Sequence, residues 1–242
     1  MNNNSDKVLV VVEDVSQRSQ LRRTLEAFGF DPGEASPGES AFMRLRMVDY
    51  DAILLGFPNQ VAEGIATCGQ LRELHPRIPI LILSDSDLLD SKVDALEAGA
   101  DHYVVNPFVE RELTARLRAA IRGYRASAIG TNGCVTVGDI KLDSEKLCIE
   151  KSGNEIFLTP LEFRALQILM TQPGKPVTHA SLLSLLWGPE RGKQRENLSV
   201  MISTLRKKLE DDPAHPVYLM THSHFGYFFA SHIPRQRNKH PV

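Results

Sequence analysis

One apolar segment limits the fold more than any other part of the sequence. Residues 52–55 read Ala-Ile-Leu-Leu, and Gly56 and a proline-containing loop follow them. A short apolar run that ends at glycine is typical of a β-strand buried on both faces of a parallel sheet. In such sheets, ligands and reacting side chains lie where the strands end. Gly56 occupies that position and has no side chain with which to react.

The first half of the chain repeats this strand pattern in alternation with helices. Further apolar runs lie at 7–12, 79–83 and 103–105, and helical patterns such as Leu21, Leu25 and Phe28 separate them. The alternation predicts an α/β fold, a doubly wound five-stranded parallel sheet whose strand ends share one edge. That edge collects Glu13, Asp14, Gly56, Ser84 and Asn106.

Charge, cysteine content and hydropathy narrow the class of protein. The chain has 242 residues, enough for two domains with cores of their own. Residues 1–126 hold 14 Lys and Arg against 19 Asp and Glu, whereas residues 127–242 hold 14 against 11, so a mildly basic half that suits a polyanion follows an acidic one. Three cysteines without a C-x-x-C motif argue against a disulfide framework or a zinc site. Without a signal peptide or an apolar run of the ~20 residues that a membrane helix needs, we expect a cytoplasmic protein with no membrane partner.

The strand-end residues resemble those of the receiver domain of two-component response regulators, and the resemblance covers residues 7–122. In that family, an acidic pair binds Mg²⁺, an Asp accepts the phosphoryl group, a Ser or Thr bonds it, and a Lys before proline holds it. The resemblance places Glu13 and Asp14 at the acidic pair, Ser84 at the hydroxyl position and Tyr103 at an aromatic switch position. Gly56 stands where the phosphoacceptor belongs, eight residues before Gly64, and Asn106 stands where the lysine belongs.

These two replacements remove groups that phosphorylation needs. The reaction requires a carboxylate nucleophile and a cation that fixes the phosphoryl oxygens. Asp51 cannot substitute, because it lies at the start of the strand, toward the opposite edge of the sheet. Two carboxylates without a third ligand also make a poor octahedral Mg²⁺ site. We therefore predict no catalytic residue, no metal and no cofactor, with Glu13, Asp14, Ser84 and Tyr103 as remnants of the pocket.

The resemblance also implies a homodimer. Receivers of the winged-helix branch pair through the face made by the fourth helix, the fifth strand and the fifth helix, using charge pairs. Lys92 and Glu112 match one such pair, and His102 replaces an acidic residue, so that one pair is lost or depends on pH. The predicted interface comprises Lys92, Asp101, His102, Glu112, Arg116, Arg118 and Arg122.

The second half has the pattern of a winged helix-turn-helix, with three helices followed by an aromatic hairpin. Residues 134–230 resemble the effector domain of the OmpR/PhoB type through the motifs Leu158-Thr-Pro-Leu-Glu-Phe163, Gln172-Pro-Gly174, Leu186-Trp-Gly188, Leu205-Arg-Lys-Lys-Leu-Glu210 and Gly226-Tyr227. In that family the third helix enters the major groove, the wing reaches the minor groove, and the loop before the third helix can touch RNA polymerase. The implied partners are double-stranded promoter DNA, with direct or inverted half-sites, and RNA polymerase.

The third helix indicates which residues contact DNA. An apolar stripe at helical spacing (Leu198, Ile202, Leu205 and Leu209) leaves the rest of the helix facing outward. Asn197 suits adenine edges, Thr204 either base type, and Val200 a thymine methyl group. Basic residues at the end of the helix suit phosphates. The predicted contacts are Asn197, Val200, Met201, Ser203, Thr204, Arg206, Lys207 and Lys208, with Ser223 and His224 in the wing.

The predicted organisation is a receiver-like domain at 1–122, a linker at 123–133, a winged-helix domain at 134–230 and a disordered basic tail at 231–242. We interpret the chain as a sequence-specific transcriptional regulator that binds DNA as a homodimer without Asp phosphorylation. An alternative is a protein-interaction adaptor whose DNA binding is weak or depends on a partner. An enzyme using Ser84, Asp85 and His102 is disfavoured, because the sequence supplies no oxyanion loop. The sequence leaves open the promoters, activation or repression, and the signal that replaces phosphate.

Overall fold

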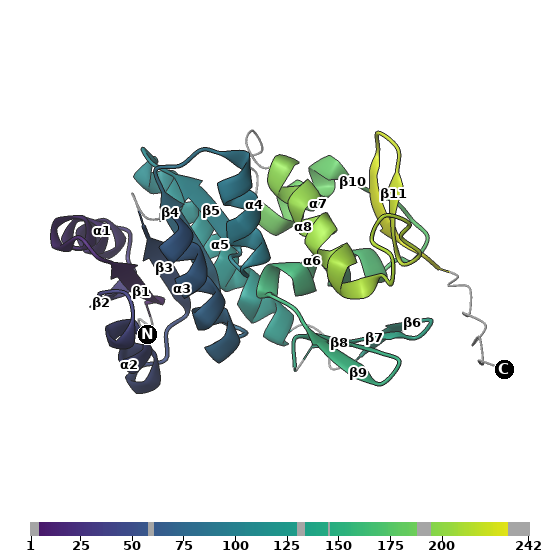
Figure 1. Cartoon of the computed structure of the whole chain (residues 1–242), viewed down its shortest axis with the longest axis horizontal. Helices are drawn as coiled ribbons and strands as arrows, with labels where there is room; N and C mark the ends of the chain where they lie inside the picture. Colours follow the sequence, from purple (N-terminus) through teal and green to yellow (C-terminus); the bar gives the residue numbers. More distant parts are fainter. Residues whose placement is uncertain (1–4, 58–60, 130–133, 145, 188–194, 232–242) are drawn as a thin grey trace.

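The computed structural model describes residues 5–57, 61–129, 134–144, 146–187 and 195–231, which form two domains packed side by side (Figure 1). No helix in these described ranges has the length and apolar character needed to cross a membrane. Of the predicted basic tail, only Ser231 lies within the described residues.

The first domain confirms the predicted doubly wound sheet. Five parallel strands stand in the order β2-β1-β3-β4-β5. The strands are β1 (Lys7–Val12), β2 (Asp31–Ala35), β3 (Ala52–Gly56), β4 (Ile80–Ser84) and β5 (His102–Val105). The helices are α1 (Val15–Ala27), α2 (Glu39–Met47), α3 (Val61–Leu74), α4 (Leu89–Glu97) and α5 (Glu110–Ile129). Alternate strand residues face two separate apolar cores, one with residues of α2, α3 and α4 and the other with residues of α1 and α5.

The register of the sheet brings the strand ends together. Gly56 pairs with Val12 of β1 on one side and with Leu83 of β4 on the other, and Ser84 pairs with Val105 of β5. The edge strand β2 contains Pro32 and Gly33, which an edge tolerates because its outer side makes no ladder hydrogen bonds. The strand ends therefore lie along one edge, as the alternation predicts.

The second domain is the predicted winged helix, preceded by a small antiparallel sheet. Strands β6 (Val135–Val137), β7 (Ile140–Asp143), β8 (Cys148–Lys151) and β9 (Asn154–Phe157) form that sheet in sequence order. The helices α6 (Pro160–Met170), α7 (His179–Trp187) and α8 (Arg195–Leu209) follow, and the wing consists of β10 (Val177–Thr178), β11 (Leu219–His222) and β12 (Gly226–Phe229). One core, with Phe163 and Phe229 fully buried, joins the helices to the wing.

Local capping chemistry explains where two of these helices begin. At α6, the hydroxyl of Thr159 accepts a hydrogen bond from the Glu162 amide, and the Glu162 carboxylate accepts one from the Thr159 amide. At α7, the hydroxyl of Thr178 accepts a hydrogen bond from the Ser181 amide. Each cap satisfies a backbone amide of the first helical turn that has no partner within its helix.

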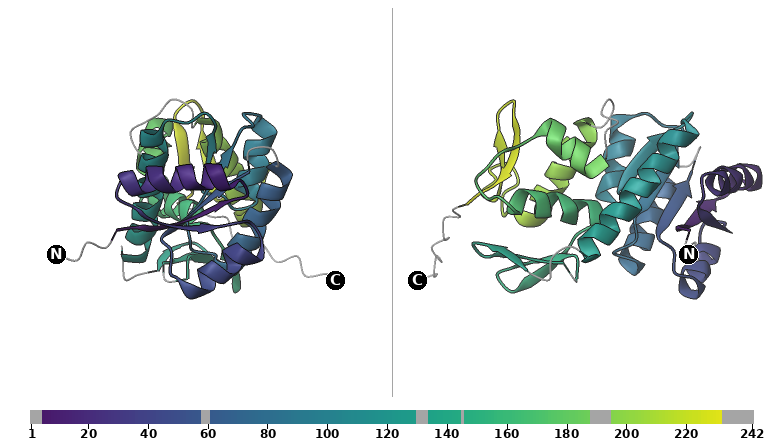
Figure 2. Two further views of the ribbon diagram at one scale, coloured as in Figure 1. Left: turned by 90° about the vertical axis from the view of Figure 1, so that its left-hand side faces the viewer. Right: turned by 180° about the vertical axis from the view of Figure 1, so that it is seen from behind.

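The predicted start of the linker is wrong. Helix α5 continues through positions 123–129, and seen from behind it crosses the receiver sheet toward the winged-helix domain (Figure 2). Gly123 is buried there, and a Cβ atom at this position would lie 2.6 Å from Nη1 of Arg164. Gly123 therefore allows α5 to approach the second domain closely. Of the predicted linker, 130–133 lie outside the described residues.

The receiver contacts the winged-helix domain through α4 and α5. Helix α5 packs against α6 and α7, while α4 packs against α8. Figures 1 and 2 show these helices between the two domains from opposite sides. We call this packing of α4 and α5 on α6, α7 and α8 the closed arrangement.

Gly226 provides a test of the wing. In Gly226→Ala, the new Cβ would lie 1.9 Å from the backbone oxygen of Val177, so β10 and β12 would have to separate. We expect the free energy of unfolding to fall by about 3 kcal/mol, as for severe overpacking. Denaturation followed by the fluorescence of Trp187, the single tryptophan, measures this change.

Gly69→Ala is the matched control, because Gly69 lies in α3 and a Cβ atom at this position would have no other atom within 4 Å. An alanine there should raise stability by about 0.5–1 kcal/mol, followed by circular dichroism. Wild-type stability of Gly226→Ala would contradict the wing geometry.

Candidate functional site

The edge of the receiver sheet has no carboxylate at the end of β3. Gly56 ends this strand, and a Cβ atom there would lie 2.9 Å from Cγ2 of Val12, which is fully buried. The side chain of Val12 thus packs against the space where a residue 56 side chain would begin. Asp51, which directly precedes β3, lies at the opposite end of the strand, where it accepts a hydrogen bond from the Lys7 amide at 2.8 Å.

The acidic pair does not form a metal site. Asp14 caps α1, with Oδ1 accepting a hydrogen bond from the Gln17 amide at 2.6 Å, and Glu13 is exposed. Nowhere in the described ranges do three or more His, Cys, Asp or Glu side chains gather in a way that could hold a metal ion. The residues at this edge therefore do not fit the Mg²⁺ ion of receiver domains, which needs oxygen ligands in octahedral geometry.

Polar side chains join the loops after β4 and β5 directly. Nδ2 of Asn106 donates a hydrogen bond to Oδ1 of Asp85 at 2.8 Å, and the Tyr103 hydroxyl donates one to the Ser86 carbonyl at 3.0 Å. Ser84 is buried, and its Oγ accepts a hydrogen bond from the Ser86 amide at 3.2 Å. The loop after β4 is thus bound to β5 and to the loop that follows it, through neutral donors.

Helix α8 carries the predicted DNA contacts, and the structure divides them into three groups. Met201 is wrongly predicted to face outward: it packs in the winged-helix core beside the apolar stripe. Asn197 and Thr204 are also buried, and Thr204 bonds its hydroxyl to the Val200 carbonyl one turn earlier. Ser203 and Lys207 are exposed, and Val200, Arg206 and Lys208 are partly exposed.

The closed arrangement covers one face of α8. Positions 197, 200, 204 and 207 recur at helical spacing, and Nζ of Lys207 forms an ion pair with the carboxylate of Glu97 on α4. Since α4 packs on α8, this is the face that it covers. Asn197 and Thr204, which have the best chemistry for base edges, share this face of α8 and are buried.

Arg206 and Lys208 of α8 bind within the protein. The Arg206 guanidinium donates to the Leu219 carbonyl at 2.8 Å and to the Thr221 hydroxyl at 2.7 Å, so it ties α8 to the wing strand β11. Lys208 forms an ion pair with Glu162 at 2.6 Å, which links α8 to the first turn of α6. Ser223 and His224 are exposed at the tip of the wing. Most of the loop that the family resemblance assigns to RNA polymerase, 188–194, lies outside the described residues.

Comparisons with known proteins agree with both domains. The model of the response regulator receiver domain matches residues 8–118, and that of the C-terminal domain of transcriptional regulatory proteins matches residues 153–229. A probable transcriptional regulator ycf27 of Porphyra purpurea is 35% identical, covering 95% of this chain and 96% of the relative. The KDP operon transcriptional regulatory protein KdpE of Escherichia coli K12 is 34% identical, covering 92% of this chain and 98% of the relative. This chain belongs to the OmpR/PhoB-type response regulators.

The family is one of DNA-binding transcriptional regulators. A solved structure of a RitR mutant has the same fold, with a TM-score of 0.77 and 23% identity, covering 94% of this chain and 100% of that one. The similarity of fold thus extends over both domains of this response regulator.

The predicted dimer face of the response regulator lies at the contact between its own domains. Asp101 and His102 are predicted to lie in a homodimer interface, but within the single chain they are already buried, at 2% and 1% exposed. Arg116 is 9% exposed and pairs with Glu112 one turn earlier at 2.5 Å. Within one chain, Lys92 pairs with Asp87. The predicted pair of Lys92 and Glu112 would join two copies of the chain, so it stays a prediction.

The two other predicted interface residues lie away from the buried part of this face. The Arg118 guanidinium stands over the ring of Phe30, 5.3 Å from its centroid, and donates to the carbonyl of Phe28, which follows α1. Arg122 is exposed near Arg164 of α6, and its positive charge contributes to a lowered pKa of Arg164, although burial is the larger cause.

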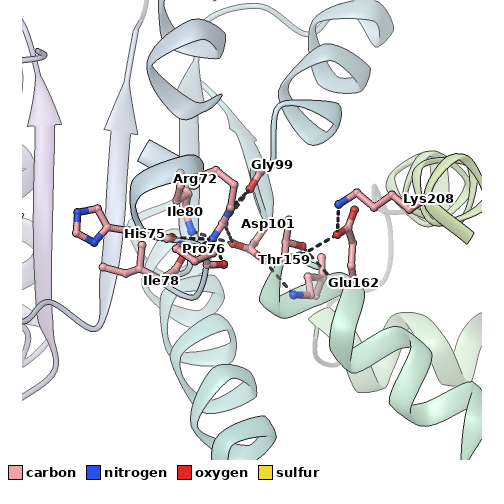
Figure 3. Close-up of polar contacts among 11 residues, drawn as sticks. Arg72, His75, Pro76, Ile78, Ile80, Gly99, Asp101, Thr159, Glu162 and Lys208 are labelled. Carbon is pink, nitrogen blue, oxygen red and sulfur yellow. Dashed lines mark hydrogen bonds and ion pairs between the residues drawn. The ribbon is translucent and has the colours of Figure 1, made fainter. Parts of the chain in front are cut away.

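Asp101 holds the two domains together through a shared set of hydrogen bonds (Figure 3). Its Oδ2 accepts from Nη2 of Arg72 at 2.8 Å and from the Ile80 amide at 2.9 Å, both within the receiver. Its Oδ1 accepts from the Leu161 amide at 3.1 Å, in the first turn of α6. Burial raises the pKa of the Asp101 carboxyl, and the charge of Arg72 and the two amides oppose that rise. A carboxylate at a helix N-terminus is also stabilised by the helix dipole.

Arg72 is a residue that sequence reasoning missed. Its guanidinium donates to the Gly99 carbonyl at 2.8 Å, the Ile78 carbonyl at 2.8 Å and the Pro76 carbonyl at 2.9 Å, in addition to Asp101. Glu210 was missed too, although it is buried and its carboxylate accepts from the amides of Val217, Tyr218 and Leu219. No local pattern marks either residue, because most of their partners are backbone atoms of other segments.

Asp101→Ala tests the shared hydrogen bonds. The substitution leaves the mostly buried Arg72 guanidinium without its carboxylate and two amides without their acceptor. Breaking a buried ion pair from one side typically costs about 3–5 kcal/mol, and we expect a loss of that size in the free energy of unfolding. Denaturation followed by circular dichroism measures it.

Glu97→Ala is the control for this prediction. It breaks the more exposed ion pair between Glu97 and Lys207, and pairs of this kind contribute about 1 kcal/mol or less. Equal losses in the two variants would contradict the role given to Asp101.

Proposed function

We propose that this response regulator binds specific DNA sequences without phosphorylation of an aspartate, and that separation of its two domains controls this binding. The observation that carries the proposal is that Gly56 and Asn106 occur together at the edge of the receiver sheet. Phosphoryl transfer needs a nucleophilic carboxylate and a positive charge near the phosphoryl oxygens. Position 56 has no side chain, and the side chain at position 106 is neutral.

The loop contacts at the sheet edge support independence from phosphate. In this chain the Asn106–Asp85 hydrogen bond connects the two loops, and the Tyr103 hydroxyl already bonds the Ser86 carbonyl. Both contacts form between uncharged donors and fixed acceptors. A phosphoryl group is therefore not required to order these loops, and the signal must act elsewhere in the molecule.

The buried face of α8 supports control by domain separation. Contact with base edges needs the outward face of the recognition helix in the major groove. In the closed arrangement Asn197 and Thr204 are buried, and Lys207 is paired with Glu97 of α4. Separating the domains would free Lys207 for phosphate contact and expose the two side chains that can read bases.

Domain separation would also release a dimerisation face. The α4–β5–α5 surface packs on the winged-helix domain of the same chain, so it cannot at the same time pair with a second copy. We propose that open chains form homodimers through this surface, with half-sites about one helical turn apart. Closure and dimerisation then compete for one surface, and DNA binding rises with protein concentration. RNA polymerase is a further proposed partner of the loop before α8.

Binding to a pool of genomic DNA fragments tests independence from phosphate. The full chain, incubated with Mg²⁺ and with or without radiolabelled acetyl phosphate, should select the same fragments and incorporate no label, because position 56 has no nucleophile. Sequencing of the bound fragments and counting of the protein give the two measurements. Fragments selected only after phosphodonor treatment, or never, would overturn the proposal.

A variant with Thr204→Ala and Lys207→Glu should lose the selected fragments, since it removes one base contact and one phosphate contact. Lys175→Glu is the control, because Lys175 is exposed in the same domain but lies outside α8. Equal loss in the control would show that net charge, and not the α8 surface, determines selection.

Glu97→Lys tests the closed arrangement. The change replaces an attraction to Lys207 with a repulsion, which should disfavour closure by roughly 1 kcal/mol, or about fivefold. We expect the selected fragments to bind about fivefold more tightly, as measured by fluorescence anisotropy. Glu63→Lys, at an exposed position of α3, makes the same change in net charge and should leave affinity near the wild-type value. Unchanged affinity in Glu97→Lys would count against control by closure.

A further inference from the structure

His102 is buried where the two domains meet. It is the first residue of β5, and its side chain is 1% exposed. It borders a cavity of about 10 Å³, which Ala119 and Tyr124 of α5, Leu161 and Arg164 of α6, and Leu186 of α7 also line. That volume is about the size of one water molecule. The winged-helix domain therefore forms part of the wall that seals this histidine from solvent.

Neither ring nitrogen of His102 has a hydrogen-bond partner within the described residues. A neutral imidazole has one donor, whereas an imidazolium has two donors and a positive charge. Burial of an unpaired charge is far more costly than burial of a neutral polar group. The closed arrangement thus accepts His102 only in its neutral form.

The charged groups that face His102 increase this preference. On α5, Arg116 lies close enough to oppose a second positive charge, and its partner Glu112 is already paired with it. On α6, Arg164 lines the cavity, and on the same segment as His102 the carboxylate of Asp101 is taken by Arg72 and two amides. The neighbours from β4 and α7 are Leu81 and Leu186, and Tyr124 contributes a neutral phenol. Burial, and then the charge of Arg116, lowers the pKa of His102 to about 3.

We propose that protonation of His102 separates the receiver from the winged-helix domain, so that mild acid uncovers α8. This inference rests on the proposed function for its consequence at DNA. The separation itself requires only that the imidazole gain access to solvent. Once the α5 and α6 walls part, water can hydrate both ring nitrogens and the added charge.

The sign of the effect follows from the two states. In the open arrangement the histidine has its ordinary pKa of about 6.5, and in the closed arrangement its pKa is depressed. Closure is therefore fully favoured above pH 6.5 and weakens as the pH falls below it, by about tenfold per unit. Between pH 7.5 and pH 5.5, the ratio of open to closed molecules should rise about tenfold. The Arg72 partner of Asp101 belongs to the receiver in both arrangements, so Asp101 adds little to this change.

Single-molecule energy transfer on the full chain measures this ratio without DNA. Dyes attached at Arg23→Cys on α1 and Ser223→Cys in the wing report the distance between the domains, since both positions are exposed. Cys134→Ser removes the exposed native thiol, while Cys68 and Cys148 are buried. The expected result is a tenfold rise in the open-to-closed ratio from pH 7.5 to pH 5.5.

Two substitutions of His102 decide the origin of that rise. His102→Gln and His102→Leu cannot titrate, so both should give a ratio that stays constant over the same pH range. His215→Gln is the control, because His215 is exposed in a turn and its Nδ1 contacts Asp212, and it should keep the wild-type response. If one His102 variant fails to fold by circular dichroism at pH 7.5, the other supplies the result.

A constant ratio in the wild-type labelled chain, or a pH response that persists in the folded His102 variants, would overturn the inference. Failure of the proposed function would give a different experimental result. In that case the distance changes with pH through His102, but the open molecules select no DNA fragments at either pH.

Discussion

The carboxylate of Asp101 is the interaction on which the arrangement of this protein depends. It accepts two hydrogen bonds from the receiver and one from the first turn of α6, and all three contacts are largely screened from water. Arg72 is in turn held by carbonyl groups around the end of α3 and the start of β5. A rigid anion is thereby presented to the positive end of a helix dipole. The orientation of α6 relative to the receiver follows from this contact, and α7 and α8 follow α6 because they share its core.

The packing of the two domains affects what the strand ends of the receiver sheet can do. In a receiver that is phosphorylated, charge arrives at the strand ends and its effect must travel to the face of α4, β5 and α5. Here the strand ends carry no phosphoacceptor, and the same face is already in contact with the effector domain. In the proposed function, the residues that respond to conditions are those between the domains, where burial perturbs their chemistry. Asp101, His102 and Arg164 are such residues, and each has a pKa shifted mainly by burial.

Sequence patterns predicted the fold well because they depend on residues that lie close together in the sequence. The alternation of apolar strands and amphipathic helices determined the sheet, and the Thr159 capping box fixed the start of α6. The empty position at Gly56 was also evident from its place after a buried strand.

Contacts between the domains could not be predicted from the sequence in this way. Leu161 lies 60 residues from Asp101, and Arg72 lies 29 residues from it, so no spacing rule connects them. The small residues of 123–129 fit both a linker and a tightly packed helix, and the packing with Arg164 selects the helix. Met201 is at a position between the two faces of α8, and the winged-helix core extends far enough to bury it.

In the proposed function, the ratio of open to closed molecules determines how far DNA binding can be regulated. Under this proposal DNA binds only the open form, so the observed affinity equals the intrinsic affinity multiplied by the fraction of open molecules. Strong closure would therefore silence the protein at any ordinary concentration, and weak closure would leave it always active. The contact between the domains combines the hydrogen bond from the Leu161 amide to the buried Asp101 carboxylate with an exposed ion pair and an uncharged histidine. The buried hydrogen bond specifies the geometry, whereas the exposed pair and the histidine contribute small, adjustable terms. A contact built in this way can be strong enough to define one arrangement and still respond to changes of a few kcal/mol.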